Sequence, residues 1–294
     1  MYAIECKNLT HYYGKKLVYE NLSFNVEEGK ILGLLGKNGT GKSTTINILN
    51  GFLQPSSGEC LIYGENTQNL SPANKSRIGF LIEGHVQYSF MNIHQIEKFY
   101  SGFYPKWNNK PYWELMSKLK VTPKQKISTM SCGQRSQVAL GLILAQDPDL
   151  LILDDFSMGL DPGYRRLFID YMREYAKAEK KTVFVTSHII QDMERLIDDV
   201  LIMDYNKILA QQPIEKFMRE FKQFNIRLTI PDMEVDFDSI AVNVEKVKDK
   251  IEFYTYASAE EVKRYLTCKG IAYDSFEEQK MSLEDAFIGL TRKY

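Results

Sequence analysis

The chain has 294 residues, of which 44% are hydrophobic and 26% charged, and its formal net charge is −1. This near-neutral balance argues against nucleic-acid binding through bulk electrostatics, which usually needs a basic surplus. The four cysteines are widely spaced and form no C-x-x-C pair, so they indicate neither a zinc site nor a disulfide framework, and a reducing, intracellular compartment is expected.

The sequence predicts neither a leader peptide nor a membrane span. The N-terminal stretch MYAIECKNLTHYYGKK lacks the apolar core of a signal peptide. The most apolar segment, VALGLILA at 138–145, falls short of the roughly 18 apolar residues that cross a bilayer. If this protein works at a membrane, we expect it to be a peripheral protein that does not span the bilayer.

The first 210 residues alternate between strand and helix patterns. ILGLLG at 31–36 is a nearly continuous apolar run, which is typical of a strand buried on both faces. The alternation predicts an α/β fold with a mainly parallel sheet and helices on both faces. The expected strands or hairpin elements are 2–6, 22–27, 31–36, 56–64, 78–84, 150–154 and 182–187, and the expected helices are 43–53, 131–146 and 164–179.

Residues 85–130 interrupt this alternation with an aromatic-rich segment whose pattern indicates several helices. Because aromatic side chains at helical spacing usually pack inward, we expect most of them in the core of a helical subdomain. The remainder are candidates for a groove that receives an amphipathic partner helix. The nine residues are Tyr88, Phe90, Phe99, Tyr100, Phe103, Tyr104, Trp107, Tyr112 and Trp113.

The polar segment 211–224 predicts a helix and marks the expected domain boundary. The expected domains are 1–212, with a helical subdomain over about 84–146, and 222–294, a small α+β appendage. Within the appendage the pattern predicts two strands around an acidic loop, a helix with a capping box and a last helix. These elements are 225–230, 250–256, a helix opening with Ser258-x-x-Glu261, and a helix from Ser282.

GKNGTGKS at 36–43 fits the phosphate-binding motif G-x-x-x-x-G-K-[ST] without a mismatch, between a predicted strand and a predicted helix. Phosphates carry concentrated negative charge, so such a loop turns backbone N–H groups inward, and glycines permit that conformation. The helix N-terminus adds a favourable dipole. The motif predicts that Lys42 reaches the β- and γ-phosphates and that the Ser43 hydroxyl ligates Mg²⁺. The residues expected to bind the nucleotide are Gly36, Lys37, Asn38, Gly39, Thr40, Gly41, Lys42, Ser43 and Thr44.

Two adjacent carboxylates, Asp154 and Asp155, end the apolar run at 150–153. Such a pair suggests a metal ligand and a proton acceptor. Asp154 lies at the carboxyl end of a predicted buried strand, where ligands bind in open α/β sheets. With a phosphate loop upstream, coordination of Mg²⁺ is its expected role.

Between these motifs, SCGQRSQVALGLILA opens a helix with Ser-x-Gly-Gln, a feature that ordinary P-loop kinases and GTPases do not explain. Here the sequence resembles the ATP-binding-cassette (ABC) family, whose signature is Leu-Ser-Gly-Gly-Gln; this chain has MSCGQ at 130–134. The resemblance spans residues 2–210 and implies a P-loop NTPase (ABC ATPase) core. It implies that Ser131, Gly133 and Gln134 face the γ-phosphate bound by a partner subunit, and we expect Cys132 to weaken that contact.

Other positions match the family in order. Tyr13 resembles the aromatic residue that stacks on adenine, with Tyr12 as a competing candidate. Asp161, the last residue of MGLD, resembles the loop that communicates across the dimer. His188, at the end of VTSH, resembles the histidine that contacts the γ-phosphate. A single tyrosine or histidine is more often structural, so these roles rest on the whole ordered set of motifs.

Two departures from the family bear on the chemistry. Glu83 stands where the family usually has a glutamine that ligates Mg²⁺ and touches the attacking water; Gln87 is the alternative for that role. Asp155 stands where the general base is normally Glu, and its stem is one methylene, about 1.5 Å, shorter. Misplacing a base can cost roughly a hundredfold in rate. We expect slow hydrolysis with Asp155, His188 and Glu83 as the catalytic residues and with Glu83 also on the metal.

The resemblance also implies cofactors, partners and a place in the cell. The cofactors are ATP and Mg²⁺, and the partners are a second ATPase subunit, identical or different, and an integral membrane permease. SLEDAFIGLTR at 282–292 resembles the tail of ABC-2-type exporter ATPases, which include drug, lantibiotic and cytolytic-peptide exporters. We therefore expect the motor subunit of an exporter of peptides or drugs, peripheral on the cytoplasmic face of the cell membrane and without a nucleic-acid partner.

Two alternatives remain open. One is a soluble ABC ATPase acting on ribosomes or DNA, but the chain has a single cassette, no long insertion between Lys42 and Ser131, and no basic surplus. The other is an ATP-gated clamp with little or no hydrolysis, which Asp155 and Cys132 suggest.

Overall fold

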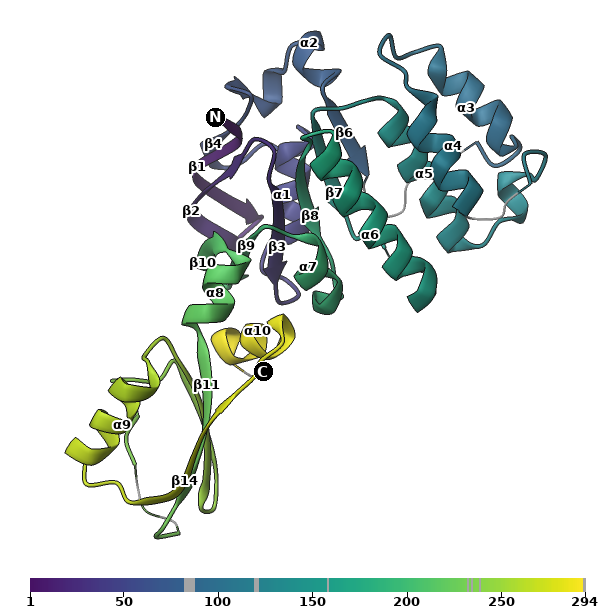
Figure 1. Ribbon diagram of the computed structural model, residues 1–294. Helices are drawn as coiled ribbons and strands as arrows, with labels where there is room; N and C mark the ends of the chain where they lie inside the picture. The colour runs from purple at the N-terminus through teal and green to yellow at the C-terminus, as the bar shows by residue number, and fades with distance from the viewer. Residues whose placement is uncertain are drawn as a thin grey trace. The chain divides into compact units, whose positions relative to one another are not determined.

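The computed structural model describes residues 1–81, 88–118, 122–157, 159–231, 233, 235–237 and 239–292. The chain divides into two compact units, Met1–Ile208 and Leu209–Tyr294, coloured in chain order in Figure 1. The described residues form two sheets that begin in the first unit and one in the second.

An antiparallel sheet of order β2-β1-β4-β5 opens the first unit. Its two long strands are joined by a tight turn in which Gly14 has a φ of 61°. The predicted strands 2–6 and 22–27 are only parts of these longer strands, since register shifts along β1 interrupt the alternating pattern. The strands are β1 (Tyr2–Tyr13), β2 (Lys16–Glu27), β4 (Ser57–Ile62) and β5 (Glu65–Asn66).

The second sheet has six strands in the order β10-β9-β3-β8-β7-β6. β3 pairs in parallel with β8 and β9, and β7 pairs in parallel with β6 and β8. These pairings confirm the mainly parallel sheet that the sequence predicted. Because β8 lies between β3 and β7, the residues that follow these three strands meet at one edge of the sheet. The strands are β3 (Ile31–Gly36), β6 (Ile78–Leu81), β7 (Leu150–Asp154), β8 (Thr182–Thr186), β9 (Asp199–Asp204) and β10 (Lys207–Pro213).

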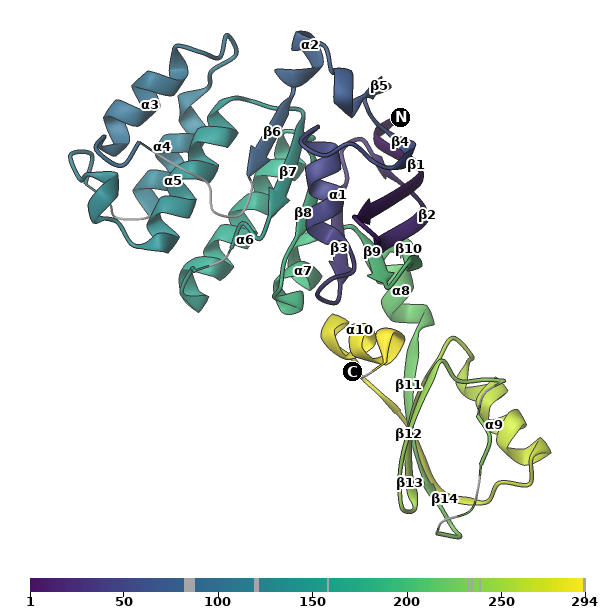
Figure 2. The same ribbon diagram turned by 180° about the vertical axis from the view of Figure 1, so that it is seen from behind.

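The helix α1 (Lys42–Leu49) lies between these two sheets, as both ribbon views show (Figures 1 and 2). Its Ile46 and Leu49 are buried in one hydrophobic cluster with Phe24 of the first sheet and Phe184 of the second. This burial fixes the start of α1, where the phosphate loop ends.

Three helices gather beside β6 in both views: α3 (Ile93–Ser101), α4 (Asn109–Lys118) and α5 (Cys132–Ala145) (Figures 1 and 2). Their core is mainly aliphatic. Of the nine aromatic residues predicted to lie mostly in this core, only Tyr112 is buried, so that prediction was wrong. Four of the nine are exposed, and their rings contact one another outside the core. We call these four residues the aromatic cluster; they are Tyr88, Phe90, Phe99 and Phe103.

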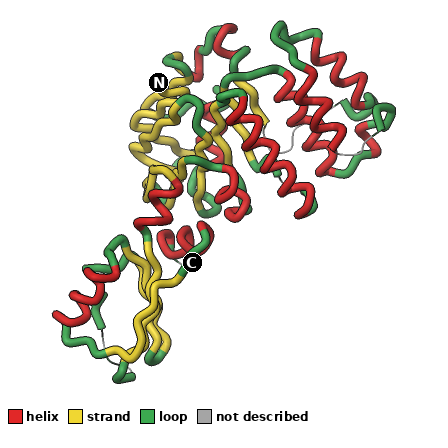
Figure 3. The backbone as a smooth tube through the Cα atoms, viewed as in Figure 1, coloured by secondary structure: helices red, strands yellow, loops and turns green. Residues whose placement is uncertain are grey.

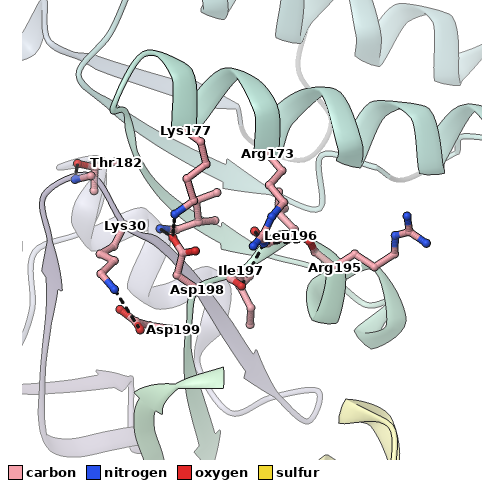
Figure 4. A network of polar contacts seen from close by, with 11 residues as sticks. Lys30, Arg173, Lys177, Thr182, Arg195, Leu196, Ile197, Asp198 and Asp199 are labelled. Carbon is pink, nitrogen blue, oxygen red and sulfur yellow. Dashed lines mark hydrogen bonds and ion pairs between the residues drawn. The ribbon is translucent and has the colours of Figure 1, made fainter. Parts of the chain in front are cut away.

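A network of polar contacts fixes the beginning of β3 (Figure 4). Arg173 donates to the carbonyl of Leu196 at 2.8 Å and so satisfies an acceptor that the end of a helix leaves open. Asp198 accepts a hydrogen bond from the backbone N–H of Ile31 at 2.9 Å and from Lys177 at 2.6 Å. β3 is thereby held to two helices at the end opposite the phosphate loop; they are α6 (Pro162–Ala178) and α7 (Ile190–Leu196).

A short helix, α2 (Pro72–Lys75), precedes β6.

The second unit contains an antiparallel sheet of order β12-β13-β11-β14, drawn in yellow in Figure 3. One face of it packs against α9, where Phe224 and Phe253 are buried with Val262 and Leu266. The predicted capping box is confirmed, since Ser258 and Glu261 exchange hydrogen bonds between side chain and backbone N–H. The strands are β11 (Lys222–Leu228), β12 (Asn243–Val247), β13 (Lys250–Thr255) and β14 (Tyr273–Gln279), and the helices are α8 (Ile214–Glu220), α9 (Ala259–Cys268) and α10 (Leu283–Thr291).

Two predicted elements of this region were wrong in part, and one strand was missed. The helix expected over 211–224 is limited to α8, because residues 211–213 end β10 and β11 begins at Lys222. The expected acidic loop contains β12, and β14 was not expected at all. Both are edge strands rich in charged residues, and edge strands lack the apolar alternation that marks a strand in a sequence.

Candidate functional site

A hollow of about 240 Å³ lies where the phosphate loop and the carboxyl end of β7 meet. We call it the phosphate-loop hollow. It brings together residues from the β1–β2 hairpin, the loop, α1 and the ends of β7 and β8. Its lining residues are Tyr13, Lys16, Val18, Asn38, Gly39, Gly41, Lys42, Ser43, Thr44, Asp154, Asp155 and His188.

Close contacts beneath the loop require its glycines. Gly41 has a φ of 101°, and a Cβ there would lie 2.6 Å from the ring of Tyr19. A Cβ on Gly36 would lie 2.6 Å from the hydroxyl of Thr40, which donates to the carbonyl of Lys37. Only glycine fits at these two positions. Tyr19 is fully buried below the loop, and sequence reasoning did not single it out.

The Lys42 ammonium is held against the loop itself. Its Nζ donates to the carbonyls of Gly36 at 2.6 Å and Lys37 at 3.0 Å. Burial lowers the pKa of Lys42, while the charges of Asp155 and Asp154 act in the opposite direction. A partly desolvated cation in a glycine-rich loop makes this hollow suited to a polyanion.

Asp154 and Ser43 line the same hollow from different elements. The Thr186 hydroxyl donates to Asp154 Oδ1 at 2.5 Å and so orients the carboxylate. No cluster of three or more His, Cys, Asp or Glu side chains that could hold a metal occurs among the described residues. One carboxylate and one hydroxyl nonetheless fit Mg²⁺, which takes hard oxygen donors and commonly relies on phosphates and waters for the rest of its coordination.

Asp155 and His188 are in direct contact. The backbone N–H of His188 donates to Asp155 Oδ1 at 2.8 Å, and His188 Nε2 lies 2.9 Å from Asp155 Oδ2. The Asp155 side chain is 10% exposed and the His188 side chain 55%. Asp155 also has a φ of 47°, in the left-handed region that few non-glycine residues adopt. The tertiary structure thus places two predicted catalytic residues side by side.

Tyr13, rather than Tyr12, lines the phosphate-loop hollow. Its hydroxyl lies 3.4 Å from that of Thr44, and its ring stands edge-on to His11 with centroids 4.9 Å apart. Lys16 pairs with Tyr13 across the hairpin and adds a cation to the hollow. Sequence reasoning missed Lys16, although the short turn at Gly14 predicts that these two residues face each other.

A second hollow of about 220 Å³, the signature hollow, lies at the start of α5. Here Ser131 and Gln134 form a capping box: the Gln134 N–H donates to Ser131 Oγ at 3.2 Å, and the Ser131 N–H to Gln134 Oε1 at 3.0 Å. The Ser-x-x-Gln spacing therefore has a structural role in starting the helix. The lining residues are Ser131, Gly133, Gln134, Gln137, Gly159, Leu160, Asp161 and Tyr164.

The signature hollow depends on close packing between α5 and the loop before α6. A Cβ on Gly133 would lie 2.7 Å from the carbonyl oxygen of Gly159. Cys132 is exposed and does not line the hollow; its sulfur lies near Gly159. Sequence reasoning missed Gln137, which is 2% exposed and whose Oε1 is buried without a hydrogen-bond partner among the described residues.

Two residues considered for the metal and water role, Glu83 and Gln87, lie outside the described residues, as does Met158 of the MGLD motif. Of the predicted loop residues, Gly36, Lys37 and Thr40 shape the loop without lining the hollow. Among the described residues, no helix is both long enough and apolar enough to span a membrane.

Comparisons with known proteins bear on both units. The profile of the ABC transporter family matches residues 19–157. YhcH of Bacillus subtilis, an uncharacterized ABC transporter ATP-binding protein, is 31% identical over 220 residues, which cover 72% of this chain and 70% of that protein. The bacitracin transport ATP-binding protein BcrA of Bacillus licheniformis is 28% identical over 299 residues, covering 98% of this chain and 96% of that protein.

The solved structures bear on the fold alone. The dimeric structure of a bacterial ABC transporter cassette matches with a TM-score of 0.63 at 21% identity, covering 72% of this chain and 98% of that one. This likeness confirms the predicted fold class for the part of the chain that it covers.

Proposed function

The chain belongs to the ABC transporter family as an ATP-binding, ATP-hydrolysing subunit, and from this premise we propose that it drives a membrane exporter of peptides or drugs. The observation that carries the proposal is the phosphate-loop hollow. It gathers a polyanion-binding loop, a metal-ligand pair and the contacting Asp155 and His188 in one place.

In this proposal the hollow binds ATP with Mg²⁺. Tyr13 stacks on the adenine, Lys42 contacts the β- and γ-phosphates, and Ser43 and Asp154 hold the metal ion, with Glu83 as a further ligand. Bound Mg²⁺ neutralises charge on the phosphates. Asp155 accepts a proton from the attacking water. His188 contacts both oxygens of the Asp155 carboxylate and orients that carboxylate toward the γ-phosphate.

The signature hollow receives the nucleotide of a second cassette. The N-terminus of α5 offers backbone N–H groups and a favourable dipole to a phosphate. Ser131, Gly133, Gln134 and Asp161 line this hollow. Two subunits therefore enclose two ATP molecules, and a structure described as a dimeric ABC transporter cassette, which shares this fold, supports the arrangement.

The aromatic cluster is the proposed docking site for the permease. Tyr88, Phe90, Phe99 and Phe103 are exposed and in edge-to-face contact, with ring centroids 5.1–6.1 Å apart. Exposed aromatic groups of this size commonly mark protein contacts. A relative named for bacitracin transport supports a role in transport, and in this proposal the chain docks on the permease at the cytoplasmic face of the membrane.

The test is ATP turnover by the purified chain, alone and together with a membrane protein that co-purifies with it. Asp155→Asn should lower the rate about a hundredfold or more and preserve ATP binding, because the amide keeps the size of the side chain but cannot accept the proton. Lys42→Ala should lose both. An unchanged rate in Asp155→Asn would refute the assigned base, and a wild-type chain that binds ATP without hydrolysis would favour the clamp.

Replacing Phe90 and Phe103 together by Ala tests the permease contact. The double variant should lose co-purification with the permease and keep the ATPase rate of the isolated chain. Retained co-purification would place the contact elsewhere on the chain.

A further inference from the structure

The sheet of the second unit has one face that its own chain covers only in part. Residues alternate along each strand, so Phe224, Ile226 and Phe253 point to α9 while their neighbours point to the opposite, open face. At one end of that face Tyr254 is buried against Phe221 and α10. At the other end lies a hollow of about 430 Å³, bounded by residues of all four strands.

Carboxylates form a row across this hollow. Glu245 of β12 pairs directly with Glu252 of β13, which pairs with Asn225 of β11, which in turn pairs with Glu277 of β14. We call these four residues the glutamate row. Like charges directly opposite each other on neighbouring strands are destabilising, so the row favours any arrangement that brings cations to it.

Cations form the next row, two residues along each strand. Lys250 of β13 pairs with Arg227 of β11, and both line the same hollow. We call these two residues the basic row. The Nε of Arg227 donates to Asp249 at 2.7 Å, which holds the guanidinium in place and leaves its other N–H groups available. Asn225 Oδ1, in the glutamate row, is buried and accepts no hydrogen bond from a described residue.

We propose that this open face binds the same face of a second copy of the chain, independently of nucleotide. Two adjacent rows of opposite charge are self-complementary. A two-fold axis between the copies, parallel to the rows and midway between them, sets each glutamate row against the basic row of the other copy. Glu252 then faces Lys250 of the second copy, and Asn225 faces an N–H donor from Arg227 of the second copy.

The mixed charge decides between a second copy and a basic segment of another protein. A basic segment would gain from Glu245, Glu252 and Glu277, but it would be repelled by Lys250 and Arg227 in the same hollow. A second copy sets both cations against the centre of the glutamate row, Lys250 against Glu252 and Arg227 against Asn225, while Glu245 and Glu277 at the two ends face Val247 and Ser275. The interface joins subunits through their second units and does not involve ATP, so it goes beyond the proposed function of the cassette.

The experiment measures self-association of the full chain by analytical ultracentrifugation without nucleotide. All variants carry Lys42→Ala, so that ATP-driven contact between cassettes makes no contribution. We expect a dimer that Glu252→Lys or Lys250→Glu weakens at least about tenfold, because each reversal acts twice in a symmetric interface. An equimolar mixture of the two single variants should regain dimers, since the reversed charges again face opposite ones.

Glu260→Lys is the matched control, because Glu260 is an exposed glutamate at the start of α9, on the other face of the sheet. It should leave the dimer unchanged. The proposal is overturned by a chain that stays monomeric, by a Glu252→Lys effect no larger than that of Glu260→Lys, or by a mixture that regains no dimer. A monomeric chain that binds a lysine-rich peptide through Glu252 would identify a basic segment as the occupant instead.

Discussion

His188 holds both oxygens of the Asp155 carboxylate. Its backbone N–H donates to Oδ1 at 2.8 Å, and its Nε2 lies 2.9 Å from Oδ2. The orientation of the short acid therefore depends on the histidine, and the two residues should act as a unit in hydrolysis. When residues act as a unit, removing either one costs nearly as much as removing both.

The first prediction concerns His188. His188→Ala should lower the ATPase rate about a hundredfold, because the Asp155 carboxylate loses its contact with the imidazole Nε2 and the proposed contact of the imidazole with the γ-phosphate is removed. Single-turnover hydrolysis measures the effect on chemistry, and fluorescence titration with a labelled ATP measures binding. Asp155→Asn combined with His188→Ala should be little slower than either single variant; additive losses would show that the residues act separately.

The second prediction concerns the length of the acid. Asp155→Glu extends the carboxylate by about 1.5 Å. If reach limits the rate, this variant should hydrolyse ATP between about tenfold and a hundredfold faster than the wild type. Steady-state phosphate release from the purified chain is the measurement. A slower Glu variant would show that the contact with His188 matters more than the reach.

The third prediction separates two neighbouring tyrosines. Tyr13→Ala should weaken ATP binding by the roughly 1–3 kcal/mol that aromatic stacking on a base contributes. Tyr13→Phe should bind nearly as well as the wild type, because the ring remains. Tyr12→Ala is the control, since Tyr12 is similarly exposed but does not line the hollow. Calorimetric titration with ATP distinguishes the three, and a larger effect at Tyr12 would reverse the assignment.

The fourth prediction tests the packing beneath the signature hollow. Gly133→Ala should destabilise the chain by about 1–3 kcal/mol, because its Cβ would press on the Gly159 carbonyl. Gly163→Ala is the matched control in α6: a Cβ there meets nothing within 4 Å, so it should be neutral or stabilise by about 0.5–1 kcal/mol. Denaturant unfolding measures both. Equal stabilities would mean that α5 and the loop before α6 move apart at no cost.

The fifth prediction uses the cysteines to detect the ATP-dependent dimer. Cys132 and Cys268 are exposed and should react quickly with a thiol reagent. Cys6 and Cys60 are buried, and burial raises the pKa of Cys6, so both should react slowly. In an Asp155→Asn chain, ATP should protect Cys132 and leave Cys268 reactive, as followed by mass spectrometry. Equal reactivity of Cys132 with and without ATP would contradict a dimer through the signature surface.

Several features followed from contiguous sequence. The loop at 36–43 was predictable because its conformation depends on its own glycines, and the capping box of Ser258 and Glu261 because helix starts depend on four successive residues. The parallel sheet followed from the apolar runs that become its central strands. Edge strands β12 and β14 did not, since charged residues there hide the strand pattern.

The local conformations and the order of the family motifs could be predicted from the sequence, because both depend on residues close together in the chain. Only the tertiary structure showed that Tyr13 rather than Tyr12 lines the phosphate-loop hollow and that His188 contacts Asp155. It also showed that most of the nine aromatic residues lie outside the core of the helical subdomain. It also aligned Glu245, Glu252 and Glu277 in one row. Such relationships depend on strand order and register, which join residues far apart in sequence through the packing of the whole unit.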